Sequence, residues 1–182
     1  RFAAEGVLAG TPGVDGVVGD LGGSSLELAR LVGGRYEGGS TYPLGPLALD
    51  TGGAFNEDKV AARARDLMSS APELKKSGDV FFAVGGAWRT IGTLHMELTR
   101  APLHMLQNYE MDAQKLLPLL SDIMTGKKYG DILQEIAKRR ASTIPYAAAV
   151  LKAVIEAGKF KTVMISSYGV REGIIFDSLD PA

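Results

Sequence analysis

The pattern of hydrophobic and polar positions begins with three strand-like runs, which are separated by turns of small residues. Residues 14–21 are mostly apolar and include an aspartate near their end, as in a central strand. After the Gly-Gly-Ser-Ser turn at 22–25, apolar and polar residues alternate over 26–32. Two glycines then lead into a third run at 36–43. The pattern predicts a three-stranded antiparallel meander over residues 14–44.

The rest of the chain switches between helical and strand periods. Four segments have helical patterns, at residues 56–68, 88–98, 145–157 and 170–179, and two fully apolar runs at 80–84 and 162–166 read as buried strands. Residues 103–141 are helical in pattern, most clearly at 109–124 and 132–140, and we interpret them as a helical insertion. This order predicts a single α/β domain over residues 1–182, with a mixed sheet of about five strands flanked by helices.

Small or glycine-rich turns follow three of the predicted strands, at residues 22–25, 85–87 and 167–169. Ligands of open α/β sheets gather beyond the carboxyl ends of the strands. We therefore expect these three turns to converge on one site.

The first of these turns carries the strongest chemical signal. Asp20 lies directly before Gly22, Gly23, Ser24 and Ser25. Glycines let the backbone approach an anion closely, hydroxyl and N–H groups donate to phosphate oxygens, and a carboxylate binds a hard cation. The segment is typical of a phosphate and metal site. An ordinary hairpin turn, with Asp20 accepting from nearby N–H groups, remains the alternative from these residues alone.

Composition narrows the range of functions. The 182 residues are 46% hydrophobic, which is enough for a sizeable core. A net charge of −1 supplies no broad field for a polyanion, so nucleic acid is not an expected partner. The chain has no cysteine, which excludes disulfides and thiolate chemistry. With no apolar run near the roughly 20 residues that span a bilayer and no signal-peptide pattern, we expect a cytoplasmic protein without membrane contact.

Several motifs in this order resemble one family. Residues 20–28 resemble the Asp-Ile-Gly-Gly-Gly-Ser-Thr-Glu motif of the exopolyphosphatase and guanosine pentaphosphate phosphohydrolase (Ppx/GppA) family, with Ser24 where the family has its third glycine. Matching segments follow in order at Tyr42–Gly45, Val84–Arg89, Arg140–Ala147, where Ser142 replaces an aspartate, and Ser167–Gly173. The last of these, Ser-Tyr-Gly-Val-Arg-Glu-Gly, is the motif most specific to the family.

The resemblance implies an actin-like ATPase (ribonuclease-H-like) domain. It further implies a hydrolase of acid anhydrides that cleaves the terminal phosphate from inorganic polyphosphate or guanosine pentaphosphate (pppGpp) with Mg²⁺, the latter a nucleotide of the stringent response. Carried over to this sequence, the metal ligands are Asp20 and Glu27, with Glu27 also catalytic. The phosphate-binding residues are Gly22, Gly23, Ser24, Ser25, Gly85, Gly86 and Arg89.

Members of this family carry a first domain of similar fold, and their proposed catalytic glutamate lies just before the segment that residues 1–7 resemble. We expect this chain to be the C-terminal half of the catalytic module, without its N-terminal domain and inactive alone. Glu5 does not occupy the matching position. The resemblance also implies a homodimer.

Two other functions fit the same pattern. The chain is alternatively the ATP-binding half of a sugar-kinase-like or actin-like ATPase, or a non-catalytic phosphate-sensing, nucleotide-sensing or dimerisation module. Single residues have structural alternatives too: Glu27 as an outward residue of an edge strand, Gly85 and Gly86 as a tight strand–helix connection, and Arg89 as a surface arginine. For Arg171 and Glu172 we expect a structural ion pair at the start of the last helix.

Overall fold

The computed structural model describes residues 1–52, 54–75, 78–126 and 128–179. A six-stranded sheet with the order β3-β2-β1-β4-β6-β5 runs through the molecule. The first three strands, β1 (Gly16–Leu21), β2 (Leu26–Val32) and β3 (Arg35–Tyr42), form the predicted antiparallel meander. Strand β4 (Val80–Val84) lies parallel to β1, and β6 (Thr162–Ser166) lies parallel to β4. The mixed α/β sheet is confirmed.

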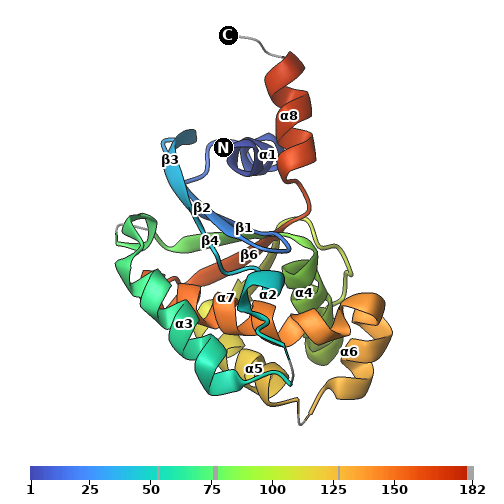
Figure 1. Cartoon of the computed structure of the whole chain (residues 1–182). Helices are drawn as coiled ribbons and strands as arrows, with labels where there is room; N and C mark the ends of the chain where they lie inside the picture. The colour runs from blue at the N-terminus through green and yellow to red at the C-terminus, as the bar shows by residue number, and fades with distance from the viewer. Residues whose placement is uncertain (53, 76–77, 127, 180–182) are drawn as a thin grey trace.

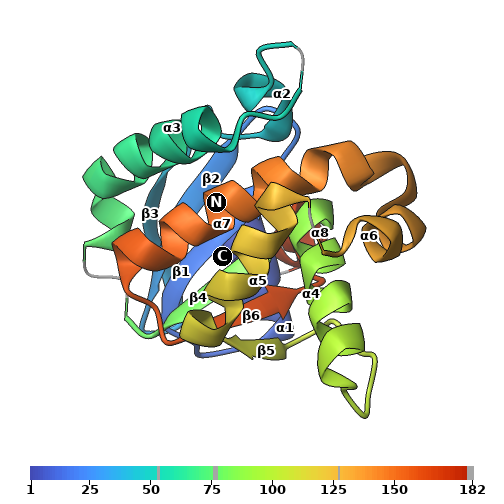
Figure 2. The ribbon, with the colours of Figure 1, turned by 90° about the horizontal axis from the view of Figure 1, so that it is seen from below.

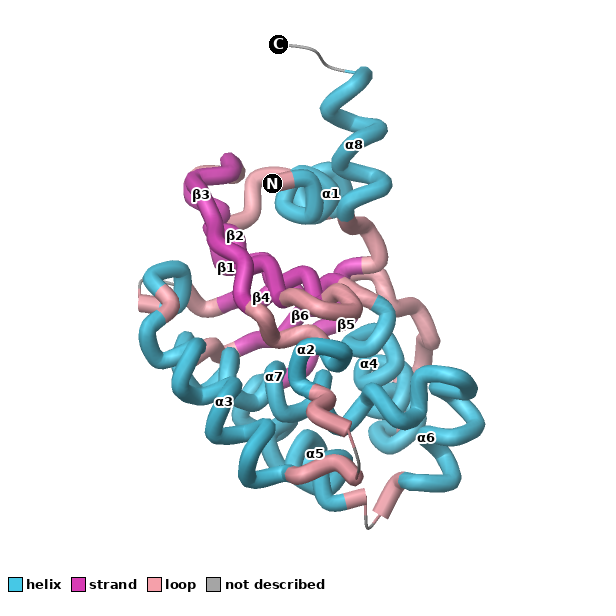
Figure 3. Tube along the Cα trace, viewed as in Figure 1, coloured by secondary structure: helices cyan, strands magenta, loops and turns pink. Residues whose placement is uncertain are grey.

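Helices cover both faces of this sheet (Figures 1 and 2). On one face lie α3 (Glu57–Ser70), α4 (Gly86–Thr99), α5 (Ala113–Thr125) and α7 (Ile144–Gly158). On the other, α1 (Phe2–Gly10) packs against α8 (Val170–Leu179), which projects away from the body (Figure 3). The shorter elements are α2 (Pro46–Leu49), η1 (Pro72–Leu74), α6 (Gly130–Ala137) and η2 (Lys138–Thr143). No helix in the described ranges has the length and apolarity that crossing a membrane requires.

Local sequence explains where several helices begin. The Asn56 side chain accepts a hydrogen bond from the Lys59 N–H at 2.9 Å and caps α3, as its position before the helical pattern predicts. Pro145 occupies the first turn of α7, where its missing N–H costs nothing. Helix α7 then lies across the sheet with an almost wholly buried surface. The indole of Trp88 donates to the Ala147 carbonyl at 3.0 Å and ties α4 to α7.

Two hydrophobic clusters sit on the two faces of the sheet. The larger one contains the inward side chains of the strands and the buried faces of α3, α4, α5 and α7. The smaller one joins Ala4 and Val7 of α1 to Val18, Ala29 and their neighbours. Successive residues of a strand point to opposite faces, so membership of a cluster tells which face each strand residue takes. The even-numbered positions of β1 therefore face α1.

The structure corrects the helical reading of residues 109–112. This segment is strand β5 (Tyr109–Asp112), antiparallel to β6 at one edge of the sheet, which therefore has six strands rather than about five. Its burial alternates, with Met111 buried and Glu110 and Asp112 exposed. The Asp112 side chain accepts from the N–H groups of Gln114 and Lys115, both at 3.0 Å, and so starts α5 directly after the strand. A strand of only four residues that runs directly into a capped helix is difficult to distinguish, in the sequence pattern, from the beginning of that helix.

Candidate active site

The hairpin from β1 to β2 places two carboxylates side by side. Asp20 and Glu27 are directly opposite each other in the antiparallel register. Both side chains point to the α1 face, because Val18 and Ala29, two positions away on each strand, pack in the cluster beneath α1. Like charges directly opposite each other are unfavourable, so this pair is costly without a counter-charge.

The turn between these strands is held from outside by the segment that precedes and begins α2. The backbone of Gly45 lies so close to the turn that a Cβ there would overlap Gly23 and Ser24. The Leu47 N–H donates to the Gly23 carbonyl at 2.8 Å, and the Gly22 N–H donates to the Ser25 carbonyl at 2.9 Å. Within the described ranges, the N–H groups of Gly23, Ser24 and Ser25 donate to no protein atom. Three donors are thus available for an anion.

Asp20 opens into a cleft of about 370 Å³ that lies beyond the carboxyl ends of β1, β4 and β6. Positively and negatively charged side chains both line this cleft. Its lining residues are Asp20, Val84, Gly85, Arg89, Arg140, Ser167, Gly169, Val170, Arg171 and Glu172. The turns after β4 and β6 therefore converge with Asp20. The turn after β1 reaches the neighbouring space instead, because Gly22, Gly23 and Gly86 line a second hollow that shares only Arg140 with the cleft.

The pKa values of two carboxylates in this cleft, those of Asp20 and Glu172, are shifted in opposite directions. Burial raises the pKa of Asp20, and the negative charge of Glu27 raises it further against the opposing effect of Arg89. The pKa of Glu172 is lowered, chiefly because its carboxylate accepts from the Gly169 N–H at 2.8 Å. The negative charge of Asp20 is thus unfavourable, and a cation would stabilise it. The charge of Glu172 is already stabilised by its hydrogen bond.

Two further predicted residues lie at the cleft in a definite arrangement. The half-buried Arg89 donates from Nη1 to the Ser167 carbonyl at 3.3 Å, which bridges α4 to the end of β6. Glu172 caps the first turn of α8 by reaching back to the Gly169 N–H. The hydrogen bond of Glu172 thus goes to this backbone group, although the charge of the neighbouring Arg171 also lowers its pKa.

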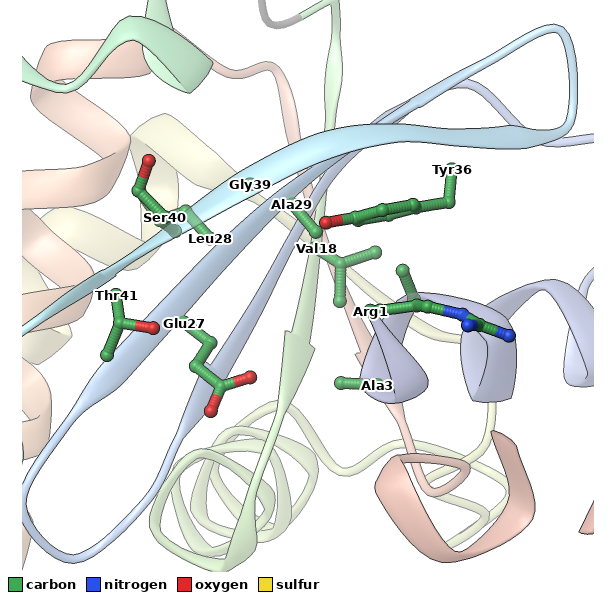
Figure 4. A pocket seen from close by; sticks show the side chains of 11 residues that line it. Arg1, Ala3, Val18, Glu27, Leu28, Ala29, Tyr36, Gly39, Ser40 and Thr41 are labelled. Carbon is green, nitrogen blue, oxygen red and sulfur yellow. The ribbon is translucent and has the colours of Figure 1, made fainter. Parts of the chain in front are cut away.

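Glu27 faces a third hollow, of about 220 Å³, between the meander and α1 (Figure 4). Its carboxylate lies on the same face as Thr41, its direct partner on β3, and across from Arg1 of the chain start. Glu27 is exposed, yet β2 is paired on both sides and is not an edge strand. Ser24 and Ser25 remain at the tip of the hairpin and line none of these three hollows.

Two further residues shape the cleft. Arg140 starts one of the family-like motifs and ends a basic segment, residues 138–140, for which the sequence suggests either guidance of a polyphosphate chain or a solvated helix end. Element η2 carries it back over Gly86, so that a Cβ on that glycine would overlap its guanidinium. Gln107 accepts the Ser167 N–H at 2.7 Å and fixes the turn after β6. Both contacts join residues more than 50 positions apart, and no local pattern reports them.

Comparison with known proteins places this geometry in a family. The model of the Ppx/GppA phosphatase family matches residues 1–182. The chain belongs to this family. Among solved structures, an exopolyphosphatase from Cytophaga hutchinsonii is similar with a TM-score of 0.82 and 16% identity, over 100% of this chain and 62% of that one. The Ppx/GppA enzyme of Aquifex aeolicus gives 0.78 and 19%, over 96% and 61%. A search of curated proteins found no match.

At these identities the solved structures establish a shared fold. It is the actin-like α/β fold of the Ppx/GppA phosphatases, as the sequence motifs predicted. The chain spans less than two thirds of the length of the structures it matches. The family to which the chain belongs is a family of phosphatases.

Proposed function

We propose that the chain is the phosphate-binding part of a phosphoanhydride hydrolase that removes the terminal phosphate from inorganic polyphosphate or pppGpp with Mg²⁺. The observation that carries this proposal is the Asp20–Glu27 pair beside a turn with three available N–H donors. The arginine-lined cleft adjoins this pair. A bound phosphoryl group needs both the carboxylates and the N–H donors. The donors hold its oxygen atoms, and the cation that the carboxylates bind neutralises the charge of those oxygens.

The donor set fits Mg²⁺. Asp20 and Glu27 offer hard oxygen atoms, and the described residues contain no group of three or more Asp, Glu, His or Cys side chains that could hold a metal ion. Mg²⁺ is commonly bound by one or two carboxylates, with waters and substrate phosphates completing its octahedron. When bound, it would neutralise charge on the phosphate oxygens. It would also relieve the repulsion between the two carboxylates.

The protein groups around the cleft would hold and orient the phosphates. Arg89, Arg140 and Arg171 bring three guanidinium groups to its wall, and guanidinium binds phosphate oxygens in a fixed, two-pronged geometry. The N–H groups of the hairpin turn add donors that need no rearrangement. Positioning and charge stabilisation of this kind supply most of the rate in phosphoryl transfer.

A base for the attacking water is the part that this chain does not supply. Glu172 is engaged by the Gly169 N–H, and Asp20 and Glu27 are assigned here to the cation, with Glu27 beside the water. We place the base in another part of the longer chain that family members have. The 182-residue chain alone should therefore release little phosphate.

A phosphate-release assay tests this function. The full-length protein that contains this chain should hydrolyse polyphosphate, pppGpp or both with Mg²⁺, and Asp20→Ala or Glu27→Ala should lower kcat by roughly 100-fold. The exposed Asp66→Ala on α3 serves as the matched control and should leave kcat unchanged. Full activity of Asp20→Ala would refute the site. Hydrolysis by the 182 residues alone at the full-length rate would refute the assignment of the base elsewhere.

A further inference from the structure

Gln107 is a half-buried residue of the turn that leads into β5, and it does not line the cleft of Asp20. The backbone beside it is fixed to the sheet, because the Asn108 N–H donates to the Ile165 carbonyl at 3.0 Å. Asn108 has a positive φ of 59°, a conformation that asparagine adopts more readily than most residues. The Gln107 side chain therefore extends from an anchored point of the backbone, close to the end of β6.

Both ends of the Gln107 amide are engaged. Its Oε1 accepts from the Ser167 N–H at 2.7 Å, and its Nε2 donates to Oδ1 of Asn108 at 2.9 Å. The same Oδ1 accepts from the hydroxyl of Thr11, the residue that follows α1, at 2.8 Å. Gly10 packs so closely that a Cβ on it would lie 2.7 Å from Nε2 of Gln107. Polar partners and close packing together hold the Gln107 side chain in one orientation.

Ser167 connects this amide to the cleft. Its carbonyl accepts from Nη1 of Arg89 at 3.3 Å, while its N–H is the group that Gln107 holds. The Arg89 guanidinium donates to no other described residue. Ser167 and Arg89 both line the cleft. A long arginine side chain is therefore directed by the carbonyl of a residue that Gln107 fixes.

We infer that Gln107 is a positioning residue of the phosphate site, which keeps the Arg89 guanidinium directed into the cleft by fixing Ser167. The inference rests on the proposed function, in which Arg89 holds phosphate oxygens. Guanidinium binds phosphate in a fixed geometry, and a group that is held in place beforehand loses less freedom on binding. Gln107 thus adds to phosphate affinity without contacting phosphate.

A double-mutant cycle tests this role, with calorimetric titration of inorganic tripolyphosphate and Mg²⁺ into the 182-residue chain. Gln107→Met keeps the length of the side chain and removes both hydrogen bonds, so it should weaken binding about fivefold. In an Arg89→Gln background the same change should weaken binding less than about twofold, because the group through which Gln107 acts is gone. Gln114→Met, at an exposed glutamine of α5, is the matched control and should leave the affinity unchanged.

A spectroscopic readout reports the position of Arg89 without any phosphate. In NMR of the ligand-free chain, rotation about the Nε–Cζ bond of Arg89 should be slower in the wild type than in Gln107→Met, because the hydrogen bond to Ser167 restrains it. Gln107→Asn keeps the amide but shortens its reach, so it should weaken binding and release Arg89 in the same way. This polar variant provides the same test if Gln107→Met folds poorly.

The outcomes separate this inference from the proposed function. The inference is overturned, with the proposed function intact, if tripolyphosphate binds the wild type with Mg²⁺ and binds the Gln107 variants as tightly. It is also overturned if the loss of affinity is as large in the Arg89→Gln background, or if the rotation of Arg89 is unchanged. If tripolyphosphate does not bind to the wild-type chain with Mg²⁺, the proposed function fails and the inference falls with it.

Discussion

At the scale of single residues, the chain keeps an unfavourable pair of carboxylates where a stable hairpin would have none. Burial and the charge of Glu27 both raise the pKa of Asp20. A carboxyl group whose folded pKa is raised lowers the stability of the fold as the pH rises through that pKa. Residues that cost stability in this way are characteristic of functional sites.

Glu27→Gln should lower the pKa of Asp20, because it removes the charge that adds to the effect of burial. Carboxyl-carbon NMR titration measures this directly, and added Mg²⁺ should lower the wild-type pKa as well. Glu110→Gln at the opposite edge of the sheet is the control and should leave Asp20 unchanged. Linkage gives a second expectation: Asp20→Asn should raise stability at neutral pH, and the gain should disappear below the ordinary carboxyl range. An unaltered Asp20 pKa in Glu27→Gln would show that the two side chains do not interact.

A partly buried hydrogen bond supports the segment that holds the phosphate turn. The Tyr42 hydroxyl donates to Glu73 at 2.7 Å, and Glu73 is only 4% exposed. Burial and this bond raise the pKa of Tyr42 to about 12, so the hydroxyl stays protonated at physiological pH. Tyr42→Phe should cost about 1–3 kcal/mol in urea unfolding, since the acceptor is left buried without its donor. Tyr36→Phe on the same strand should cost far less, and equal losses in the two variants would remove this role from Tyr42.

At the scale of elements, the sequence predicts what local pattern determines. The hairpin follows from strand alternation around one turn, and both buried strands follow from short apolar runs. The direct pairing of Asp20 with Glu27 is a finding of the structure. Strand β5 was missed because it has only four residues and its last one, Asp112, is also the cap of α5. The contact of Arg140 with Gly86 and the role of Gln107 were not predicted, because both join residues that are distant in sequence. Long-range packing, which leaves no periodic signal, decides these positions.

The crossing of α1 and α8 depends on close backbone contact at glycines. A Cβ on Gly173 would overlap the carbonyl oxygen of Phe2, and one on Gly6 would overlap the carbonyl of Gly169. Gly173→Ala should therefore destabilise the chain by about 1–3 kcal/mol, as overpacking does. Gly130→Ala in α6 has open space around it and should be neutral or stabilising by up to about 1 kcal/mol. Urea unfolding of both variants measures the difference, and equal stabilities would mean that the two helices do not cross this closely.

At the scale of the whole molecule, the sheet separates a large packed core from a functional face. The helices beneath the sheet bury most of the core, while the carboxylate pair and two of the hollows lie where α1 and α8 leave the other face open. The chain spans less than two thirds of the solved structures it matches. A partner domain of the same protein and a homodimer stay predictions of the family resemblance, and a cytoplasmic location stays a prediction from the sequence.

We propose above all that the hairpin from β1 to β2 is a Mg²⁺-dependent phosphate site. Calorimetric titration of inorganic tripolyphosphate into the 182-residue chain, once with Mg²⁺ and once with a chelator, tests it most directly. Mg²⁺ should tighten tripolyphosphate binding roughly tenfold or more, a difference of about 1.4 kcal/mol, and this tightening should be lost in the Asp20→Asn/Glu27→Gln double variant. Equal affinity with and without Mg²⁺, or a Mg²⁺ effect that survives in the double variant, would contradict the claim.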